Sequence, residues 1–208
     1  MILALDPATT VGWAAGAPGE TPTWGSRQFD GKATGAVVGL FRHWLIERCR
    51  ELHPTLVVFE APYIPRPNAA VPINAKTLRR LLGLVATIEA VSWELRVRCY
   101  ETTALDIARF FVGSARMPRN AKKAATIDMC RRYGWHVTND NEADALALWH
   151  LAEATVAPEI GLRRGAGPLM LPPKPEMRAP PGVTNQRALF PPTTNTPTEG
   201  RLDGRITR

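Results

Sequence analysis

Residues 2–14 read ILALDPATTVGWA, and this stretch decides how the chain folds. Four apolar residues lead to a single acid, Asp6, and after residues 7–9 a second apolar run begins. Two apolar runs on either side of a turn predict a hairpin of strands over residues 2–6 and 10–15. The first strand is therefore predicted to be buried, with the carboxylate of Asp6 fixed at its end.

The composition is that of a globular protein with a basic surface. Apolar residues make up 45% of the 208 positions, which is enough for a core, and the formal net charge is +7 at pH 7. A sequence pI of about 9.8 favours a polyanionic partner such as nucleic acid. A merely soluble basic surface would carry the same charge, so charge alone does not choose between the two readings.

Cysteine usage and hydropathy predict a soluble, cytoplasmic protein. Cys49, Cys99 and Cys130 show no paired spacing, so we expect free thiols in a reducing compartment. The first acid comes too early for a signal peptide, and no apolar run approaches the roughly 18 residues of a membrane helix. We therefore expect no membrane partner.

Strand and helix patterns alternate over the first three quarters of the chain and predict an α/β fold. Further strands are expected over residues 23–29, 55–60 and 96–101, and helices over residues 34–52, 75–95, 104–112, 120–134 and 139–154. This order predicts a mixed five-stranded sheet flanked by helices on both faces.

The composition changes near residue 157, which predicts a domain boundary. Ten of the nineteen prolines and few large apolar residues lie in residues 157–208. Such a segment buries too little surface to offset its chain entropy. We therefore predict a folded domain over residues 1–156 and a disordered, basic C-terminal tail over residues 157–208.

Three acids occupy comparable places in the predicted elements. Asp6 and Glu60 each end an apolar strand, and Asp144 lies in the first turns of the last helix. Parallel strands that end at one edge of a sheet bring their terminal side chains together. Gathered carboxylates repel one another, so such a cluster favours a divalent cation, and oxygen ligands favour Mg²⁺ or Mn²⁺. The simpler alternative is that each acid ends its element and faces solvent.

Four segments together resemble the RuvC-like Holliday junction resolvases of the ribonuclease H-like superfamily. They are ILALDPATTVGWA (2–14), LVVFEAPY (56–63), NAKTLRRLLGLVATIEAV (74–91) and NEADALALW (141–149). Their order and spacing match over about residues 1–155, and the tail lies outside the resemblance. The resemblance implies a ribonuclease H-like fold, and it implies that Asp6, Glu60 and Asp144 bind metal, with two ions per active site.

The chain departs from the family at the fourth metal ligand. Family members carry Asp or His three residues before the helix acid, where this chain has Asn141. Asp140 lies four residues before Asp144 on the same helix face, whereas Glu142 points away from it. Asp140 is therefore our candidate fourth ligand. Capping of the helix by Asp140 and metal ligation by the amide oxygen of Asn141 remain alternatives.

Basic and aromatic residues near these acids are candidates for DNA contacts. In the resembled family a lysine lies beside the scissile phosphate, and Lys122 is the nearest match, with Lys123 as the alternative. Tyr63 stands where the family carries an aromatic residue that inserts at the branch point, and packing against nearby prolines is its alternative role. The expected DNA-binding residues are Tyr63, Arg66, Lys76, Arg79, Arg80, Arg116, Arg119, Lys122 and Lys123.

The motifs predict a metal-dependent endodeoxyribonuclease that cleaves four-way (Holliday) DNA junctions. The expected catalytic residues are Asp6, Glu60, Asp140, Asp144 and Lys122. The resemblance implies attack by a metal-activated water, 5′-phosphate and 3′-hydroxyl products, a homodimer, and a bacterial or phage-infected host cell. Two alternatives remain. One is a nuclease of the same fold that acts less selectively on branched or flap DNA, and the other is a DNA-binding relative without catalysis.

Overall fold

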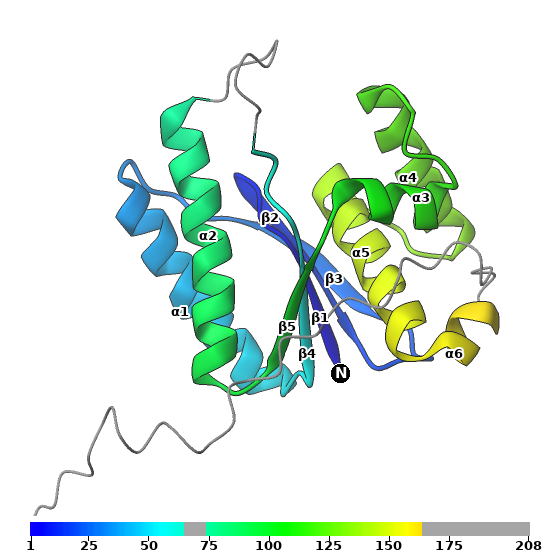
Figure 1. The fold of residues 1–208 in the computed structure, drawn as a ribbon, viewed down its shortest axis with the longest axis horizontal. Coiled ribbons are helices and arrows are strands. Elements are labelled where there is room, and N and C mark those ends of the chain that lie inside the picture. The colour runs from blue at the N-terminus through cyan, green and yellow to red at the C-terminus, as the bar shows by residue number, and fades with distance from the viewer. Residues whose placement is uncertain (65–73, 164–208) are drawn as a thin grey trace, which may run out of the picture.

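The computed structural model describes residues 1–64 and 74–163, and its centre is one mixed sheet (Figure 1). The strands are β1 (Ile2–Asp6), β2 (Thr10–Gly16), β3 (Thr23–Gln28), β4 (Leu56–Glu60) and β5 (Arg98–Thr102). Their order across the sheet is β3-β2-β1-β4-β5. β1 pairs with β2 in antiparallel and with β4 in parallel orientation, and β5 pairs in parallel with β4. The predicted mixed five-stranded sheet is confirmed.

Helices cover both faces of this sheet. They are α1 (Thr34–Leu52), α2 (Ala75–Glu94), α3 (Ala104–Val112), α4 (Arg119–Arg132), α5 (Asp140–Val156) and α6 (Pro158–Arg163). The helices α1 and α2 lie on one face, and α3 to α6 lie on the other (Figure 1). Apart from α6, every helix begins and ends within two residues of its predicted bounds.

The apolar character of the central strands follows from burial on both faces. Successive side chains of a strand point to opposite faces of the sheet. In β1, Ile2 and Ala4 pack under α5, whereas Leu3 and Leu5 pack against α1 and α2. The neighbouring strand β4 divides its side chains between the same two cores. The first strand is therefore buried as predicted, and Asp6 is its last residue.

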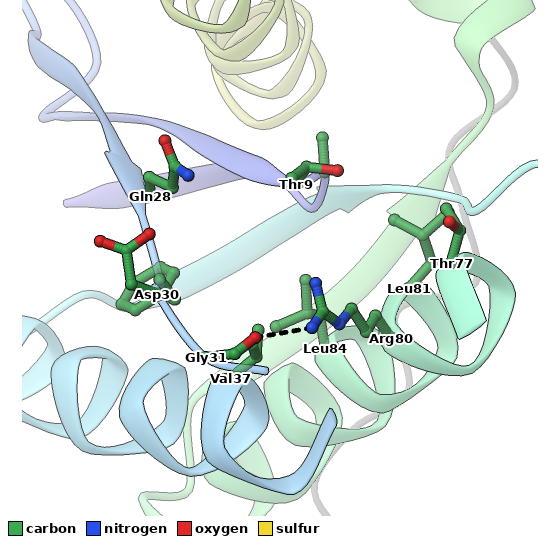
Figure 2. A pocket seen from close by; sticks show the side chains of 11 residues that line it. Thr9, Gln28, Asp30, Gly31, Val37, Thr77, Arg80, Leu81 and Leu84 are labelled. Atoms are coloured by element: carbon green, nitrogen blue, oxygen red, sulfur yellow. Dashed lines mark hydrogen bonds between the residues drawn. The ribbon is translucent and has the colours of Figure 1, made fainter. Parts of the chain in front are cut away.

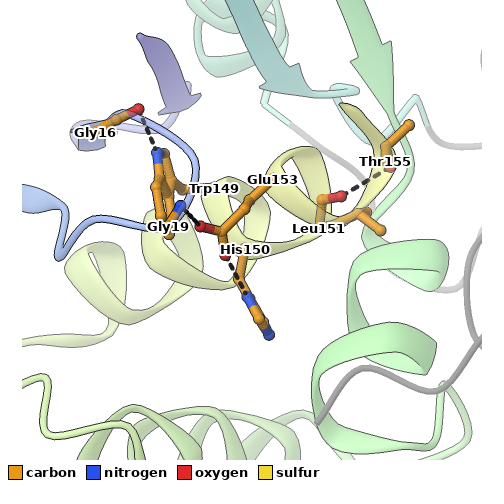
Figure 3. Close-up of polar contacts among 7 residues, drawn as sticks. All are labelled: Gly16, Gly19, Trp149, His150, Leu151, Glu153 and Thr155. Carbon is orange, nitrogen blue, oxygen red and sulfur yellow. Dashed lines mark hydrogen bonds and ion pairs between the residues drawn. The ribbon is translucent and has the colours of Figure 1, made fainter. Parts of the chain in front are cut away.

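The helix α5 is attached to the β2–β3 hairpin by buried polar contacts (Figure 3). The Glu153 side chain, which is 0% exposed, accepts a hydrogen bond through Oε1 from the Gly19 backbone N–H at 2.8 Å. Its Oε2 lies 3.3 Å from Nδ1 of the buried His150, and Trp149 Nε1 donates to the Gly16 carbonyl at 3.4 Å. These contacts fix α5 at the end of β2 that is remote from Asp6.

The structure departs from the predicted tail at its beginning. Residues Pro158–Arg163 form α6, which packs against α5 (Figure 1). Ala157 is buried and its N–H donates to the Glu153 carbonyl at 2.8 Å, while Ile160 lies next to Gly19. The prediction of disorder is thus wrong for residues 158–163, because a few local contacts suffice to attach one short helix. Residues 164–208 lie outside the described residues.

Within the described ranges, no helix is both long enough and apolar enough to cross a membrane.

Candidate active site

The three predicted acids converge at one edge of the sheet. β1 and β4 are parallel neighbours in register, with Leu5 opposite Phe59, so Asp6 and Glu60 leave the sheet at the same edge. Asp144 comes from the first turns of α5, which packs over β1 and β2. All three side chains are partly buried. The alternative that each acid ends its element and simply faces solvent is therefore wrong.

Burial and mutual repulsion raise the pKa values of these acids. Burial raises the pKa of Glu60 to about 7, and the charge of Asp144 adds to the rise. Burial also raises the pKa of Asp6 well above its usual range, with further contributions from Glu60 and Asp144. The pKa of Asp144 is raised by burial as well. Carboxylates that affect one another in this way share one electrostatic site.

The donor chemistry of this site fits a divalent cation. Within the described part of the chain, no group of three or more Asp, Glu, His or Cys side chains is arranged so that it could hold a metal ion as it stands. The three carboxylates nevertheless repel one another in a partly buried place, and a dication would remove that repulsion. Oxygen ligands of this kind suit Mg²⁺ or Mn²⁺.

The structure distinguishes the two candidate lysines. Lys122 lines a small pocket of about 50 Å³ together with Glu60, Asp144 and Thr126, and its charge acts to lower the pKa values of both acids. The Nζ of Lys123 instead donates a hydrogen bond to Asp140. Lys122 is thus the lysine that lies beside Glu60, although the charge of Lys123 also acts to lower the pKa values of Asp6 and Asp144. The place of Lys122 beside a substrate phosphate stays a prediction.

The candidate fourth ligand, Asp140, does not cap α5. Asn139 is the N-cap residue, since its Oδ1 accepts from the Glu142 N–H at 3.0 Å, and Glu142 in turn accepts from the Thr138 N–H at 2.8 Å. The capping alternative for Asp140 is therefore wrong. The hydrogen bond from Lys123 lowers the pKa of Asp140.

Asp140 nevertheless belongs to the same electrostatic site as the other acids. Its charge raises the pKa of Asp6 and of Asp144. Metal ligation by Asp140 stays a prediction, and so does ligation by the Asn141 side chain.

Gly12 in β2 lets α5 pack closely against the strand beside Asp6, a role that was not predicted from the sequence. Gly12 is the cross-strand partner of Asp6, and a Cβ atom at Gly12 would collide with the backbone of Asn141 in α5. An isolated glycine inside a strand often marks a close approach of another backbone. That signal was present in the sequence, in the run between Asp6 and Trp13.

The predicted DNA-binding residues differ in their surroundings. Tyr63 is 66% exposed just after β4, so it is available for stacking. Lys76 and Arg79 are exposed near the start of α2, Arg119 is exposed as the first residue of α4, and Arg116 is exposed in the segment before it. Arg66 lies outside the described residues.

Arg80, one of the expected DNA-binding residues, is only partly exposed and bonds to the protein's own backbone. Its Nη2 donates to the carbonyls of Gly31 at 2.7 Å and of Lys32 at 3.2 Å, which joins α2 to the loop before α1 (Figure 2).

Comparisons with known proteins identify the fold. No protein-family model matches the chain, and no curated protein sequence matches it. The structure is similar to that of Thermus thermophilus RuvC, with 16% identity, a TM-score of 0.53, and coverage of 79% of this chain and 96% of that one.

Two further solved structures are similar to this chain. One is T. thermophilus RuvC in complex with a Holliday junction substrate, with 13% identity, a TM-score of 0.52, and coverage of 79% and 95%. The other is the yeast mitochondrial Holliday junction resolvase Ydc2, with 11% identity, a TM-score of 0.42, and coverage of 71% and 76%. The chain therefore has a RuvC-like fold of the ribonuclease H-like type.

Proposed function

We propose that this protein is a metal-dependent endodeoxyribonuclease that cleaves four-way DNA junctions. The observation that carries the proposal is the convergence of Asp6, Glu60 and Asp144 at one edge of a RuvC-like fold. The similar structure of T. thermophilus RuvC holds a Holliday junction substrate, which supports branched DNA as the substrate class here. The net charge of +7 supports a polyanionic substrate.

Asp6, Glu60 and Asp144 would hold Mg²⁺ or Mn²⁺, with Asp140 as the proposed fourth ligand and two ions in the site. Such ions, when bound, lower the pKa of water and neutralise the charge that develops on a phosphodiester. Lys122 places a cation beside Glu60 and Asp144, where it would offset the charge of a bound phosphate. The proposed reaction is hydrolysis that leaves 5′-phosphate and 3′-hydroxyl ends.

The surrounding residues would bind and orient the DNA. The exposed side chains Lys76, Arg79, Arg116 and Arg119 supply positive charge for backbone phosphates, and Lys123 lies next to Lys122 on α4. Tyr63 is exposed where it could stack on a base at the branch point. A homodimer would match the two-fold symmetry of a four-way junction.

A non-catalytic DNA-binding relative is the second candidate. The pairing of Asp140 with Lys123, and Asn141 in place of the family's usual acid, favour it. The remaining acids oppose it, because three partly buried carboxylates that raise one another's pKa values destabilise a protein that never binds a cation. We therefore favour the junction nuclease over the non-catalytic relative. A less selective nuclease for branched or flap DNA would differ from it only in the range of its substrates.

A cleavage assay tests the proposal directly. The full chain is incubated with labelled four-way, flap and linear duplex DNA, in Mg²⁺, in Mn²⁺ and in EDTA. We expect cleavage of the four-way junction with either metal and none in EDTA. Asp6→Asn, Glu60→Gln and Asp144→Asn should abolish cleavage and retain junction binding, whereas Glu47→Gln, at an exposed position on α1, should cleave normally. Junction binding without cleavage by the wild type would favour the binding relative.

A further inference from the structure

The first turn of α5 lies over one row of residues that crosses three strands of the sheet. Asp6 in β1 is the cross-strand partner of Gly12 in β2, and Gly12 is the partner of Ser26 in β3. Residues directly opposite each other on neighbouring strands point to the same face of a sheet, so the side chains of Asp6 and Ser26 both lie on the α5 face. The backbone of Asn141 packs against the middle of this row, at Gly12.

A side-chain hydrogen bond joins α5 to the Ser26 end of the row. Asn139, the N-cap residue of α5, donates through Nδ2 to the Oγ of Ser26 at 3.0 Å. Ser26 is partly buried, and its strand β3 lies at the edge of the sheet. The two residues are 113 positions apart in the chain. The bond is therefore a tertiary contact between helix and sheet and goes beyond the capping of the helix.

The Asn139 amide has one orientation because both of its ends are used. Its Oδ1 accepts from the Glu142 N–H at 3.0 Å. The Glu142 side chain is 8% exposed and accepts from the N–H and the Oγ1 of Thr138, at 2.8 Å and 2.9 Å. If the amide turned over, its NH₂ group would meet the Glu142 N–H, and two donors would face each other. The network at the start of α5 thus directs the Asn139 NH₂ group at Ser26.

We propose that Ser26 and Asn139 are positioning residues, which fix the first turn of α5 and with it the places of Asp140 and Asp144 relative to Asp6. The inference rests on the metal site of the proposed function. Asp140 follows Asn139 directly, and Asp144 lies one turn further along the same helix. A slide or rotation of the first turn would therefore move both acids relative to the sheet. Groups that hold metal ligands in place change metal affinity or activity by about 10–100-fold when they are removed.

The positioning role can be separated from the folding of α5. The cap itself needs only the bond from the Glu142 N–H to the Asn139 side chain, and a serine would supply such an acceptor about as well. At the other end of β2, Glu153 and Trp149 attach the helix to the sheet independently. Loss of the bond to Ser26 should therefore loosen the first turn and leave the rest of the helix in place.

Ser26→Ala is the variant that tests the proposal, because it removes the acceptor on the sheet and leaves the cap intact. Mn²⁺ is titrated against the full chain without DNA, and free Mn²⁺ is followed by electron paramagnetic resonance. We expect the variant to bind Mn²⁺ about tenfold more weakly than the wild type. The Mg²⁺ concentration for half-maximal junction cleavage should rise by a similar factor. Amide hydrogen exchange in EDTA should be faster at Glu142 and Ala143, whereas junction binding in EDTA should not change.

Three further variants distinguish positioning from a general loss of stability. Ser26→Thr keeps the hydroxyl group and should restore wild-type Mn²⁺ binding. Asn139→Ser keeps a cap but is too short to reach Ser26, so it should reproduce the defect, and the double variant with Ser26→Ala should be no worse than either single variant. Thr23→Val is the matched control, because it removes another hydroxyl of β3, which donates to the Ala15 carbonyl at 3.3 Å. It should bind Mn²⁺ like the wild type.

The outcomes separate this inference from the proposed function. Wild-type Mn²⁺ affinity in Ser26→Ala, or an equal loss of affinity in Thr23→Val, would overturn the positioning role and leave the nuclease function standing. A wild type that binds Mn²⁺ and cleaves no junction would overturn the nuclease function, while the Mn²⁺ titration of Ser26→Ala would still decide the positioning role. A wild type that binds no Mn²⁺ would overturn both.

Discussion

The backbone of Gly12 in β2 lies so close to Asn141 in α5 that a Cβ atom on Gly12 would stand 2.0 Å from the Asn141 carbonyl oxygen. Gly12 is also the cross-strand partner of Asp6, and Asp144 follows Asn141 by three residues. The missing side chain therefore lets the helix that carries Asp144 approach the strand that carries Asp6. At the other end of β2, Glu153 and Trp149 fix the same helix.

Gly12→Ala should separate Asp144 from Asp6. The new methyl group meets backbone atoms, which have no alternative rotamer, so α5 must move or the fold must strain. We expect a loss of about 1–3 kcal/mol in the free energy of unfolding and a loss of cleavage of at least about a hundredfold. Urea unfolding and junction cleavage measure the two effects.

Gly39→Ala is the matched control, since nothing lies within 4 Å of a Cβ at that position of α1. It should stabilise the protein slightly, because alanine favours a helix over glycine, and it should leave cleavage unchanged. Wild-type cleavage by Gly12→Ala would refute the positional role of Gly12.

Glu60→Gln should stabilise the metal-free protein. Because the pKa of Glu60 is raised from 4.5 to about 7, the folded state holds this proton more tightly than the unfolded chain does. The stability that protonation of Glu60 gives is present at low pH and is lost as the pH rises from about 4.5 to 7. The substitution removes the charge, so in EDTA at pH 7.5 the free energy of unfolding should rise by roughly 2 kcal/mol.

The measurement is urea unfolding in EDTA between pH 4.5 and 8, for the wild type and Glu60→Gln. The variant should show a flatter dependence on pH, and added Mg²⁺ should stabilise the wild type more than the variant. Glu47→Gln, at an exposed site, should follow the wild type. Destabilisation by Glu60→Gln across this pH range would mean that the carboxylate is not repelled in the folded protein.

The sequence alone was enough to predict the sheet and the close approach of Asp6 and Glu60. The reasons for this are physical. β1 and β4 are apolar on both faces because both faces are covered, and such strands stand out from the surrounding helices. Parallel strands end at one edge, so Asp6 and Glu60 had to meet there.

Contacts that depend on one side-chain orientation could not be predicted. The choice of Asn139 over its neighbour as the cap, the pairing of Lys123 with Asp140, and the bonds from Arg80 to two carbonyls all follow from tertiary placement. No periodicity in the sequence encodes such contacts. The short helix α6 was missed because composition describes a whole segment and hides a few local contacts within it.

Asp140→Asn should raise the Mg²⁺ concentration needed for half-maximal cleavage by about tenfold. The reason is that the loss of one of four carboxylates weakens the attraction for a dication. Asn139 supplies the cap in either case, so the helix should stay intact. Lys123→Gln is the converse variant, because it releases the Asp140 carboxylate and should lower the Mg²⁺ requirement. If both variants titrate like the wild type, Asp140 is a partner of Lys123 and not a metal ligand.

The three cysteines should be unreactive in the native protein at neutral pH. Burial raises the pKa of Cys49 and of Cys99 to about 11, and that of Cys130 to about 12. At pH 8 the reactive thiolate is then roughly one in a thousand for Cys49 and Cys99 and about one in ten thousand for Cys130. A colorimetric thiol reagent should label the folded protein slowly and label three thiols in denaturant. Fast labelling of one cysteine at pH 8 would show that its site opens readily.

Two truncations should behave differently at the boundary of the folded domain. Removal of residues 157–208 deletes α6 together with the buried Ala157, and it exposes part of α5 next to Gly19. Removal of residues 164–208 keeps these contacts. We expect the shorter deletion to keep the wild-type midpoint of thermal unfolding and the longer one to lower it by several degrees.

Residues 164–208 carry seven basic and three acidic residues, a net charge of +4, so both truncated proteins should bind DNA more weakly and with less dependence on salt. Equal midpoints for the two truncated proteins, measured by circular dichroism, would place the domain boundary at residue 156 and leave α6 without a role in stability.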